Sequence, residues 1–377
     1  MRLSLSKEKY PLRNALIGAI LIFCFEGFQG NHNAATPHIR GGYKLLKGQL
    51  ATNSSTSRPS VPVEEDLIHA FCRLDLQSML VVDSQQVLLG RRPFITMDWG
   101  KSIEKMPSQF LNLAEAHQYW GIVMWRCSYF LHSASALVDT PILDGSQDNL
   151  SINIRSVAHQ SFPNGPIPSE ILLQQRKYLE ENACWQAAFR HLLLTGRKSD
   201  RHAAALLQFH AVGQRLVLEA ASVAAVDECA FDTYLPEFRK MLSLAKTFFA
   251  KSPSEQGREI CSLDIGVIPG LYAIVRLCRN GSVRREALGL LRDFPRREGV
   301  WDSLLVAGIG QWIMEVEEEG LEGGFVPERA RAGLAKVEVD ILNRSATLEY
   351  SKRAIDRGVV SLQKTIPSNA YIAPRIN

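Results

Sequence analysis

The sequence lacks the features that place a protein in several common classes. Its seven cysteines lie 17 to 57 residues apart, so the chain contains no CxxC pair and no Cys/His set with the spacing of a zinc module. This dispersed pattern is typical of reduced, buried thiols in an intracellular protein. The formal net charge is only +4 in 377 residues, which is too small to indicate a nucleic-acid-binding protein by itself.

The signatures of enzyme active sites are missing as well. The chain has no GxSxG nucleophile turn, no GxxxxGK[ST] phosphate loop and no HExxH zinc motif. The histidines nearest to one another, His191, His202 and His210, are separated by 11 and 8 residues, so one helix face does not present two of them as neighbouring ligands. We therefore predict no catalytic, cofactor-binding or metal-ligating residue, no cofactor and no enzymatic activity.

One apolar run, Ala15 to Phe25, admits two interpretations. Its 11 residues are too few to span a bilayer, so no membrane association is expected. Basic residues precede the run, as in a secretory signal, but Glu26 follows it at once and no Ala-x-Ala cleavage site is evident. We expect a helix that is buried on nearly all sides, with a secreted helical protein as the weaker alternative.

Apolar side chains recur at helical spacing along most of the chain, and no stretch shows the clear alternation of a half-buried strand. The sequence predicts an all-α fold, an irregular multi-helix bundle of antiparallel helix pairs. We expect one helical domain over residues 1–357, with a flexible loop at 48–62, irregular segments at 83–107 and 139–168, and a weakly ordered tail at 358–377. The expected helices span residues 12–28, 34–47, 64–82, 108–138, 169–195, 199–225, 233–250, 269–280, 283–294, 299–319 and 327–350.

The long helix expected at 108–138, with Ser108 as its N-cap, carries an apolar stripe that has two interpretations. The stripe consists of Trp120, Met124, Cys127 and Leu131, at steps of 4, 3 and 4. Core packing is the simpler interpretation. The alternative is a small-molecule-binding protein or enzyme whose site lies along this helix, with Arg126 and His132 nearby.

Two charged segments near the C-terminal third are further candidates for contact with a partner. Seven arginines fall within 22 residues, and interleaved acidic residues can pair with many of them. An acidic run, Glu317 to Glu319, lies near the end of an expected helix and is interpreted as a solvated face, with an acidic interaction patch as the alternative. The arginines are Arg276, Arg279, Arg284, Arg285, Arg292, Arg296 and Arg297.

Several blocks resemble the C-terminal regulatory domain of fungal transcription factors whose DNA-binding unit is a binuclear zinc cluster of six cysteines. They are ALIGAILIFCFEGFQGNHNAATPHIRGGYKLL at 15–46, LIHAFCRLDLQSM at 67–79 and, most specifically, LDIGVIPGLYAIVRLCRNGSVRREALGLL at 263–291. The last block leads to REGVWDSLL at 297–305 and then to the helix GQWIMEVEEEG. In this block we expect Pro269 in a first helical turn, Trp301 in the core and Asp302 paired with an arginine, all of them scaffold residues.

The resemblance implies a nuclear regulator of metabolic or secondary-metabolite genes, although a cytoplasmic location is also open. It implies an indirect mechanism, in which helical surfaces bind a protein partner or small-molecule effector. Direct DNA contact is not expected, because the family's cysteine cluster is absent from this sequence. A shortened gene product, an incompletely delimited gene and a domain that acts without its own DNA reader all fit this absence. Homo- or heterodimerisation stays open.

Overall fold

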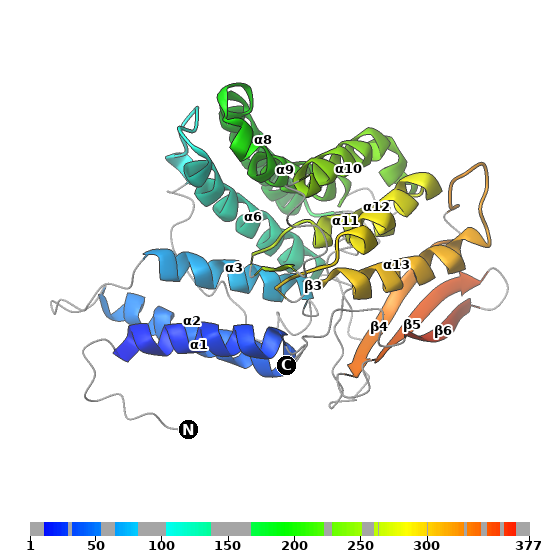
Figure 1. Cartoon of the computed structure of the whole chain (residues 1–377), viewed down its shortest axis with the longest axis horizontal. Coiled ribbons are helices and arrows are strands. Elements are labelled where there is room, and N and C mark those ends of the chain that lie inside the picture. Colours follow the sequence, from blue (N-terminus) through cyan, green and yellow to red (C-terminus); the bar gives the residue numbers. More distant parts are fainter. Residues whose placement is uncertain are drawn as a thin grey trace.

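The structure is a computed structural model and describes most of the chain. Its ten described α-helices dominate, so the prediction of a predominantly α-helical fold is confirmed (Figure 1). The described residues are 11–28, 32–53, 65–81, 103–136, 167–221, 228–250, 260–262, 264–299, 301–327, 330–340, 345–354 and 358–366. The helices are α1 (Pro11–Phe28), α2 (His32–Asn53), α3 (Glu65–Val81), α6 (Leu113–Ala136), α8 (Ser169–Thr195), α9 (Arg201–Ala220), α10 (Leu235–Phe249), α11 (Ile268–Leu277), α12 (Gly281–Asp293) and α13 (Ser303–Glu318).

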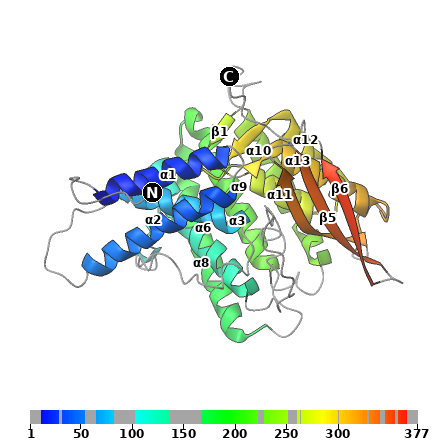
Figure 2. The ribbon, with the colours of Figure 1, turned by 90° about the horizontal axis from the view of Figure 1, so that it is seen from below.

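The first three helices pack around a small core of their own (Figures 1 and 2). Leu16 and Phe23 of α1 contribute to this core and are fully or almost fully buried. The opposite face of α1 is open, since Leu21 is 62% and Phe25 is 60% exposed. The expectation that this apolar helix is buried on nearly all sides was therefore wrong for its outer face. Within the described helices, no segment is both long and apolar enough to cross a bilayer.

The other seven helices share two larger cores. One lies between α6, α8 and α9 and is rich in aromatic side chains. The other joins α9 and α10 to α11, α12 and α13. Because α9 supplies side chains to both, it lies between them, as Figure 1 shows. A minor cluster formed by Leu76, Ile122 and Trp125 connects α3 to α6.

Two three-stranded sheets complete the described fold. In the first, the short strands β1 (Ile260–Ser262), β2 (Arg296–Glu298) and β3 (Trp301–Asp302) pair in that order. In the second, β4 (Ala332–Asp340), β5 (Ser345–Ala354) and β6 (Gly358–Ile366) form an antiparallel meander beside α13 (Figure 1).

The meander corrects two predictions. The helix expected at 327–350 is wrong, because β4 and β5 occupy most of that range. The tail expected from residue 358 begins with a nine-residue strand, β6, paired along its length with β5. The absence of clear strand alternation was thus misleading for this region, although the sheet is small beside the helices.

Helix ends differ from their predictions in ways that hydrogen bonds explain. The long helix starts at Leu113 rather than at residue 108, and its cap is Asn112, whose Oδ1 accepts from the backbone N–H of Glu115 at 2.9 Å. The loop expected at 48–62 is helical as far as Asn53. The remainder of that loop, residues 82–102 and residues 137–166 lie outside the described part of the chain.

Candidate functional site

The antiparallel helices α12 and α13 bring two neighbouring arginine–glutamate pairs together. Arg284 and Arg285 are adjacent on α12, and Glu317 and Glu318 are adjacent on α13. Successive residues of a helix point about 100° apart, so one member of each doublet faces the core and the other faces outward. The inner pair is Arg284–Glu317 and the outer pair is Arg285–Glu318.

Capping residues set where these two helices begin. Asn280 caps α12, and its Oδ1 accepts from the N–H of Val283 at 3.2 Å. Asp302 caps α13, and its Oδ1 accepts from the N–H groups of Leu304 and Leu305, both at 3.0 Å. These bonds fix the helical phase of each doublet, because they fix the first turn of each helix.

The inner pair belongs to a buried cluster of charge in which Glu317 is fully inaccessible to solvent. Its Oε2 lies 2.7 Å from Nη2 of Arg284 and 3.1 Å from Nη1 of Arg331, and its Oε1 lies 4.0 Å from Nη1 of Arg276. Arg331 also donates to the backbone carbonyl of Arg276. One carboxylate therefore ties α11, α12 and α13 to the residue that directly precedes β4.

Burial shifts the pKa values of groups in this cluster. Loss of water lowers the pKa of the Arg284 guanidinium from its ordinary value, although Glu317 opposes the shift. Burial raises the pKa of nearby Tyr272 to about 12, so this phenol is neutral at physiological pH. The cluster thus gathers three guanidinium groups around one buried carboxylate and joins the elements that carry them.

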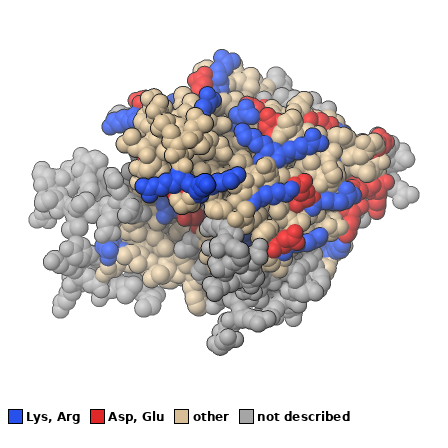
Figure 3. Space-filling model, turned by 45° about the horizontal axis from the view of Figure 1, so that its top comes forward, with Lys and Arg blue, Asp and Glu red and all other residues tan. Residues whose placement is uncertain are grey.

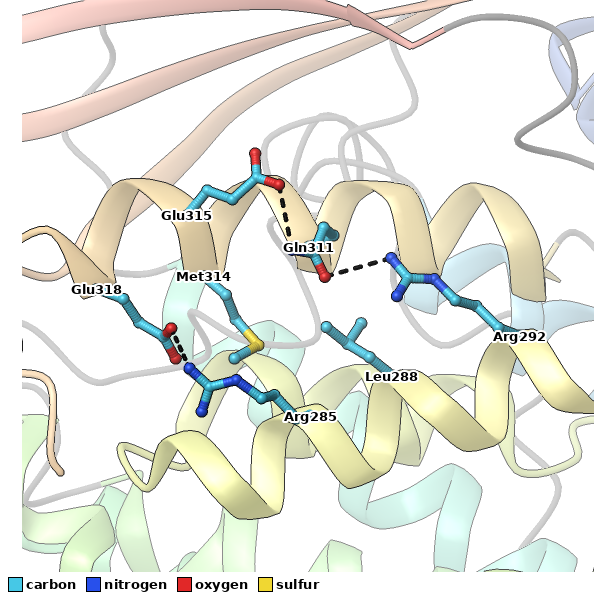
Figure 4. Close-up of a pocket in the computed structure, with 7 residues that line it drawn as sticks. All are labelled: Arg285, Leu288, Arg292, Gln311, Met314, Glu315 and Glu318. Carbon is cyan, nitrogen blue, oxygen red and sulfur yellow. Dashed lines mark hydrogen bonds and ion pairs between the residues drawn. The ribbon is translucent and has the colours of Figure 1, made fainter.

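A pocket with a volume of about 340 Å³ opens on the outer side of the same helix pair (Figure 4). Leu288 and Met314 lie in its middle, where α12 and α13 meet, and both are almost completely buried. The paired Arg285 and Glu318 close one end. Its lining residues are Arg285, Leu288, Arg292, Gln311, Met314, Glu315 and Glu318.

A chain of polar contacts forms the other end of the pocket. Nη2 of Arg292 donates to Oε1 of Gln311 at 3.3 Å, and Nε2 of Gln311 donates to Oε1 of Glu315 at 3.1 Å. Nζ of Lys364 on β6 donates to the other oxygen of Glu315 at 2.9 Å. These contacts lower the pKa of Glu315, with the Lys364 bond as the largest cause, so this carboxylate stays ionised. The meander therefore holds one wall of the pocket in place.

This arrangement is best suited to the binding of a small molecule. The lining combines guanidinium donors, carboxylate and amide acceptors, and two apolar side chains within a volume at the lower end of small-ligand pockets. Among the residues that the structure describes, no group of three His, Cys, Asp or Glu side chains is placed to hold a metal ion.

The arginine-rich segment does not form a basic surface, since most of its side chains are in the interior. Arg285 and Arg292 are the exposed members, and both line the pocket. On the face shown in Figure 3, basic and acidic side chains lie close to one another rather than in one basic field. The buried arginines are Arg276, Arg279, Arg284, Arg296 and Arg297.

The acidic run also differs from its prediction. Glu319 is exposed, as a solvated face requires, and Glu318 is partly buried in its ion pair. Glu317 is fully buried, so the interpretation of this run as a solvated face was wrong for the residue that matters most to packing.

The apolar stripe of α6 is core, which weighs against a ligand site along this helix. Trp120 is 1% exposed, Cys127 is 0% exposed, and Trp120 contacts Trp185 with ring centroids 4.9 Å apart. Arg126 forms a double hydrogen bond with Glu181 at 2.8 and 2.7 Å. The side chain of His132 lies outside the described part.

The three histidines compared in the sequence do not converge. His202 bonds through Nδ1 to the carbonyl of Thr247 at 2.9 Å, and His210 bonds through Nε2 to the carbonyl of Gly266 at 2.7 Å. His191 is exposed near the end of α8. Burial lowers the pKa of His210 to about 4, so its ring is neutral and serves to join α9 to the turn before α11.

Three residues in and after the block with the most specific resemblance occupy the scaffold positions expected of them. Pro269 lies in the first turn of α11. Trp301 is 3% exposed and packs against Tyr272, and Asp302 is paired with Arg297 at 3.3 Å. The doublets that build the pocket lie within the same region.

Comparison with known proteins gives one informative relationship. The chain is similar to the aspercryptin biosynthesis cluster-specific transcription regulator atnN of Emericella nidulans, with 21% identity over 393 aligned positions. The alignment covers 83% of this chain but 60% of the regulator, so the chain spans less than two thirds of that relative's length. No family model and no solved structure matches the chain. This distant relationship supports a regulator-like role.

Proposed function

We propose that this chain is a regulatory module of a fungal transcription regulator that controls metabolic or secondary-metabolite genes from the nucleus. The observation that carries the proposal is the relationship to a cluster-specific transcription regulator across 83% of the chain. The name of that relative refers to a biosynthesis cluster, which favours secondary metabolism as the controlled process. The regulatory domain of a zinc-cluster transcription factor is the part of such a regulator that the sequence resembles.

In this proposal the module acts through binding rather than catalysis. An effector or protein partner that favours one arrangement of α12, α13 and the meander would shift the population of regulatory states. The pocket between α12 and α13 supports this mechanism, because residues from both helices line it and Lys364 of β6 contacts its wall. Direct DNA contact forms no part of the proposal, since five of the seven clustered arginines are buried.

Deletion of the gene tests the proposal in the native host. We expect transcripts of one or more neighbouring biosynthetic genes to change at least severalfold, and a reintroduced wild-type copy to restore them. The measurement is whole-transcriptome sequencing under conditions in which the gene is expressed. Unchanged neighbouring transcripts would count against a cluster-specific role.

A fusion of the whole chain to an unrelated DNA-binding domain tests the regulatory activity directly. We expect the fusion to alter a reporter gene that carries the matching operator. The matched control is the same fusion with Glu317→Gln, which breaks the buried cluster and should abolish the effect by destabilising the module. A reporter that responds to neither fusion would contradict the proposed function.

A further inference from the structure

The outer face of α1 carries an apolar patch that the rest of the fold leaves open. Leu21 is 62%, Ile22 is 41% and Phe25 is 60% exposed, and the three lie within five residues of one another. Figures 1 and 2 show α1 at the periphery of the molecule. Residues 14–25 contain no charged side chain, as is usual for the centre of a protein–protein interface. The patch therefore has the composition of a docking surface.

The patch has a gap at one end and a large ring at the other. A Cβ added to Gly18 would meet no atom from another part of the fold within 4 Å, so the surface above this residue is open. Phe25 is seven residues further on, which places it on the same helix face, about 10 Å along the axis. Leu21 and Ile22 lie between the gap and the ring. The shape of the patch thus changes from concave to convex along α1.

This shape is complementary to itself under a two-fold rotation. In an antiparallel pair of α1 helices with the axis between Leu21 and Ile22, the Phe25 ring of each copy lies opposite the partner's Gly18. The same contact is made twice, as an isologous interface requires, and Leu21 and Ile22 of both copies fill the centre. A parallel pair would instead place ring against ring and gap against gap. The geometry therefore favours a second copy of the chain, in the antiparallel orientation, over an unrelated partner.

We propose that the outer face of α1 binds a second copy of this chain and forms a reversible dimer through an antiparallel pair of α1 helices. The exposed parts of the three apolar side chains amount to roughly 300 Å² per copy, so two copies bury roughly 600 to 900 Å² once their neighbours are included. A stable dimer buries more than about 1,200 Å², so the area indicates a Kd on the order of tens of micromolar. The inference goes beyond the proposed function and does not depend on it.

The experiment is sedimentation velocity of the full chain at concentrations from about 1 to about 200 µM. We expect the average mass to rise with concentration from that of one chain toward that of two. Phe25→Glu places a charge where the ring meets the gap, and it should weaken dimerisation by at least about tenfold while the fold is kept, since Phe25 is exposed. Leu173→Glu is the matched control, because Leu173 is a 66% exposed leucine on α8, and it should dimerise as the wild type does.

Two further variants test the pairing of ring and gap. Gly18→Phe adds apolar surface but fills the gap that the partner's Phe25 enters, so it should weaken the specific dimer by at least about tenfold. Non-specific association would instead become stronger. Combining Gly18→Phe with Phe25→Ala exchanges the ring and the gap and should restore the dimer, because the two-fold axis brings the exchanged positions together again. Far-UV circular dichroism checks that each variant is folded.

The inference is wrong if the chain stays monomeric over the whole concentration range, if Phe25→Glu dimerises as the wild type does, or if Gly18→Phe associates more strongly. A monomeric chain that co-sediments with phosphatidylcholine vesicles would overturn it in favour of a lipid surface. These results are independent of the reporter assay. An active fusion of a monomeric chain refutes the dimer alone, whereas a dimer whose fusion is inert refutes the proposed function alone.

Discussion

Replacement of Glu317 by glutamine probes the buried anchor between the helices and the meander. The side chain is fully buried, forms an ion pair with Arg284 at 2.7 Å and accepts a hydrogen bond from Arg331 at 3.1 Å, with Arg276 at 4.0 Å. Glutamine has nearly the same size and shape, so packing is preserved while the negative charge is lost. The substitution therefore isolates the electrostatic contribution of the cluster.

We expect Glu317→Gln to lower the free energy of unfolding by about 3 to 5 kcal/mol, the cost of leaving buried charge without its partner. That is a large part of the roughly 5 to 15 kcal/mol by which native proteins are stable. With a urea m-value of about 3 kcal/mol/M, the midpoint should fall by about 1 M or more. Equilibrium urea unfolding followed by tryptophan fluorescence measures this shift.

The neighbouring residue provides the control. Glu318→Gln removes the same charge from the next position of α13, where the partner Arg285 is 57% exposed. Solvent screens this outer pair, so its loss should cost less than about 1 kcal/mol. If the two variants are equally stable, or if Glu317→Gln costs less than about 1 kcal/mol, the buried cluster does not anchor the fold and this reasoning is wrong.

Three other substitutions test separate features of the fold. The folded-state pKa of His210, about 4, lies below the ordinary value of 6.5, so the unfolded chain takes up a proton first as the pH falls. The free energy of unfolding should therefore fall by about 2 kcal/mol between pH 6.5 and pH 4. Urea unfolding across this range should show that His210→Gln flattens this pH dependence. Gly299 has φ of +58°, and a Cβ there would lie 1.8 Å from Oε1 of Gln77, so Gly299→Ala should cost more than about 1 kcal/mol and lower the thermal midpoint. Asn280→Ala should cost about 1 kcal/mol in the same assay by removing the α12 cap, whereas Asn280→Asp should restore most of it.

Helical periodicity predicted the helices well where one apolar face is continuous. The helix expected at 233–250 is α10, and those expected at 269–280 and 283–294 correspond to α11 and α12 within three residues at either end. These helices have a strong difference between buried and exposed faces, which a sequence pattern reports directly. The helix α1 is apolar on all sides, so its sequence carried no information about which face is exposed.

The meander was missed in part because its first strand does not keep a single alternation. The register of β4 against β5 shifts between Leu334 and Lys336, and Ala335 is the extra residue. A bulge of this kind reverses the phase of inward and outward positions. Within β4 only the segment from Lys336 to Asp340 alternates cleanly, and five residues are too few to outweigh the helical pattern that precedes them. In β5 the residues from Ser345 to Ser351 do alternate between polar and apolar, so a strand signal was present there and was overlooked.

The sequence did contain a signal for the inner charge cluster, but the many arginines of the same segment obscured it. Arg284 is spaced three, four and seven residues from Ala287, Leu288 and Leu291, which are all buried, so it lies on the apolar face of α12. Considering the arginines together as a basic segment removed this distinction. Which carboxylate faces Arg284 depends on how α12 and α13 are rotated about their axes, and that is a property of tertiary packing.

The buried anchor and the pocket are linked because adjacent residues of α12 and α13 contribute to each of them. Glu317 holds α12 and α13 together through Arg284, and one position along each helix Glu318 and Arg285 form the end of the pocket. The spacing of the outer pair is therefore set by the inner pair, which solvent does not reach. A small movement of one side chain therefore does little to adapt the pocket to a ligand. A ligand must either fit the existing spacing of α12 and α13 or displace these helices against the buried ion cluster. Only displacement of the helices would alter the position of the meander that begins at Ala332.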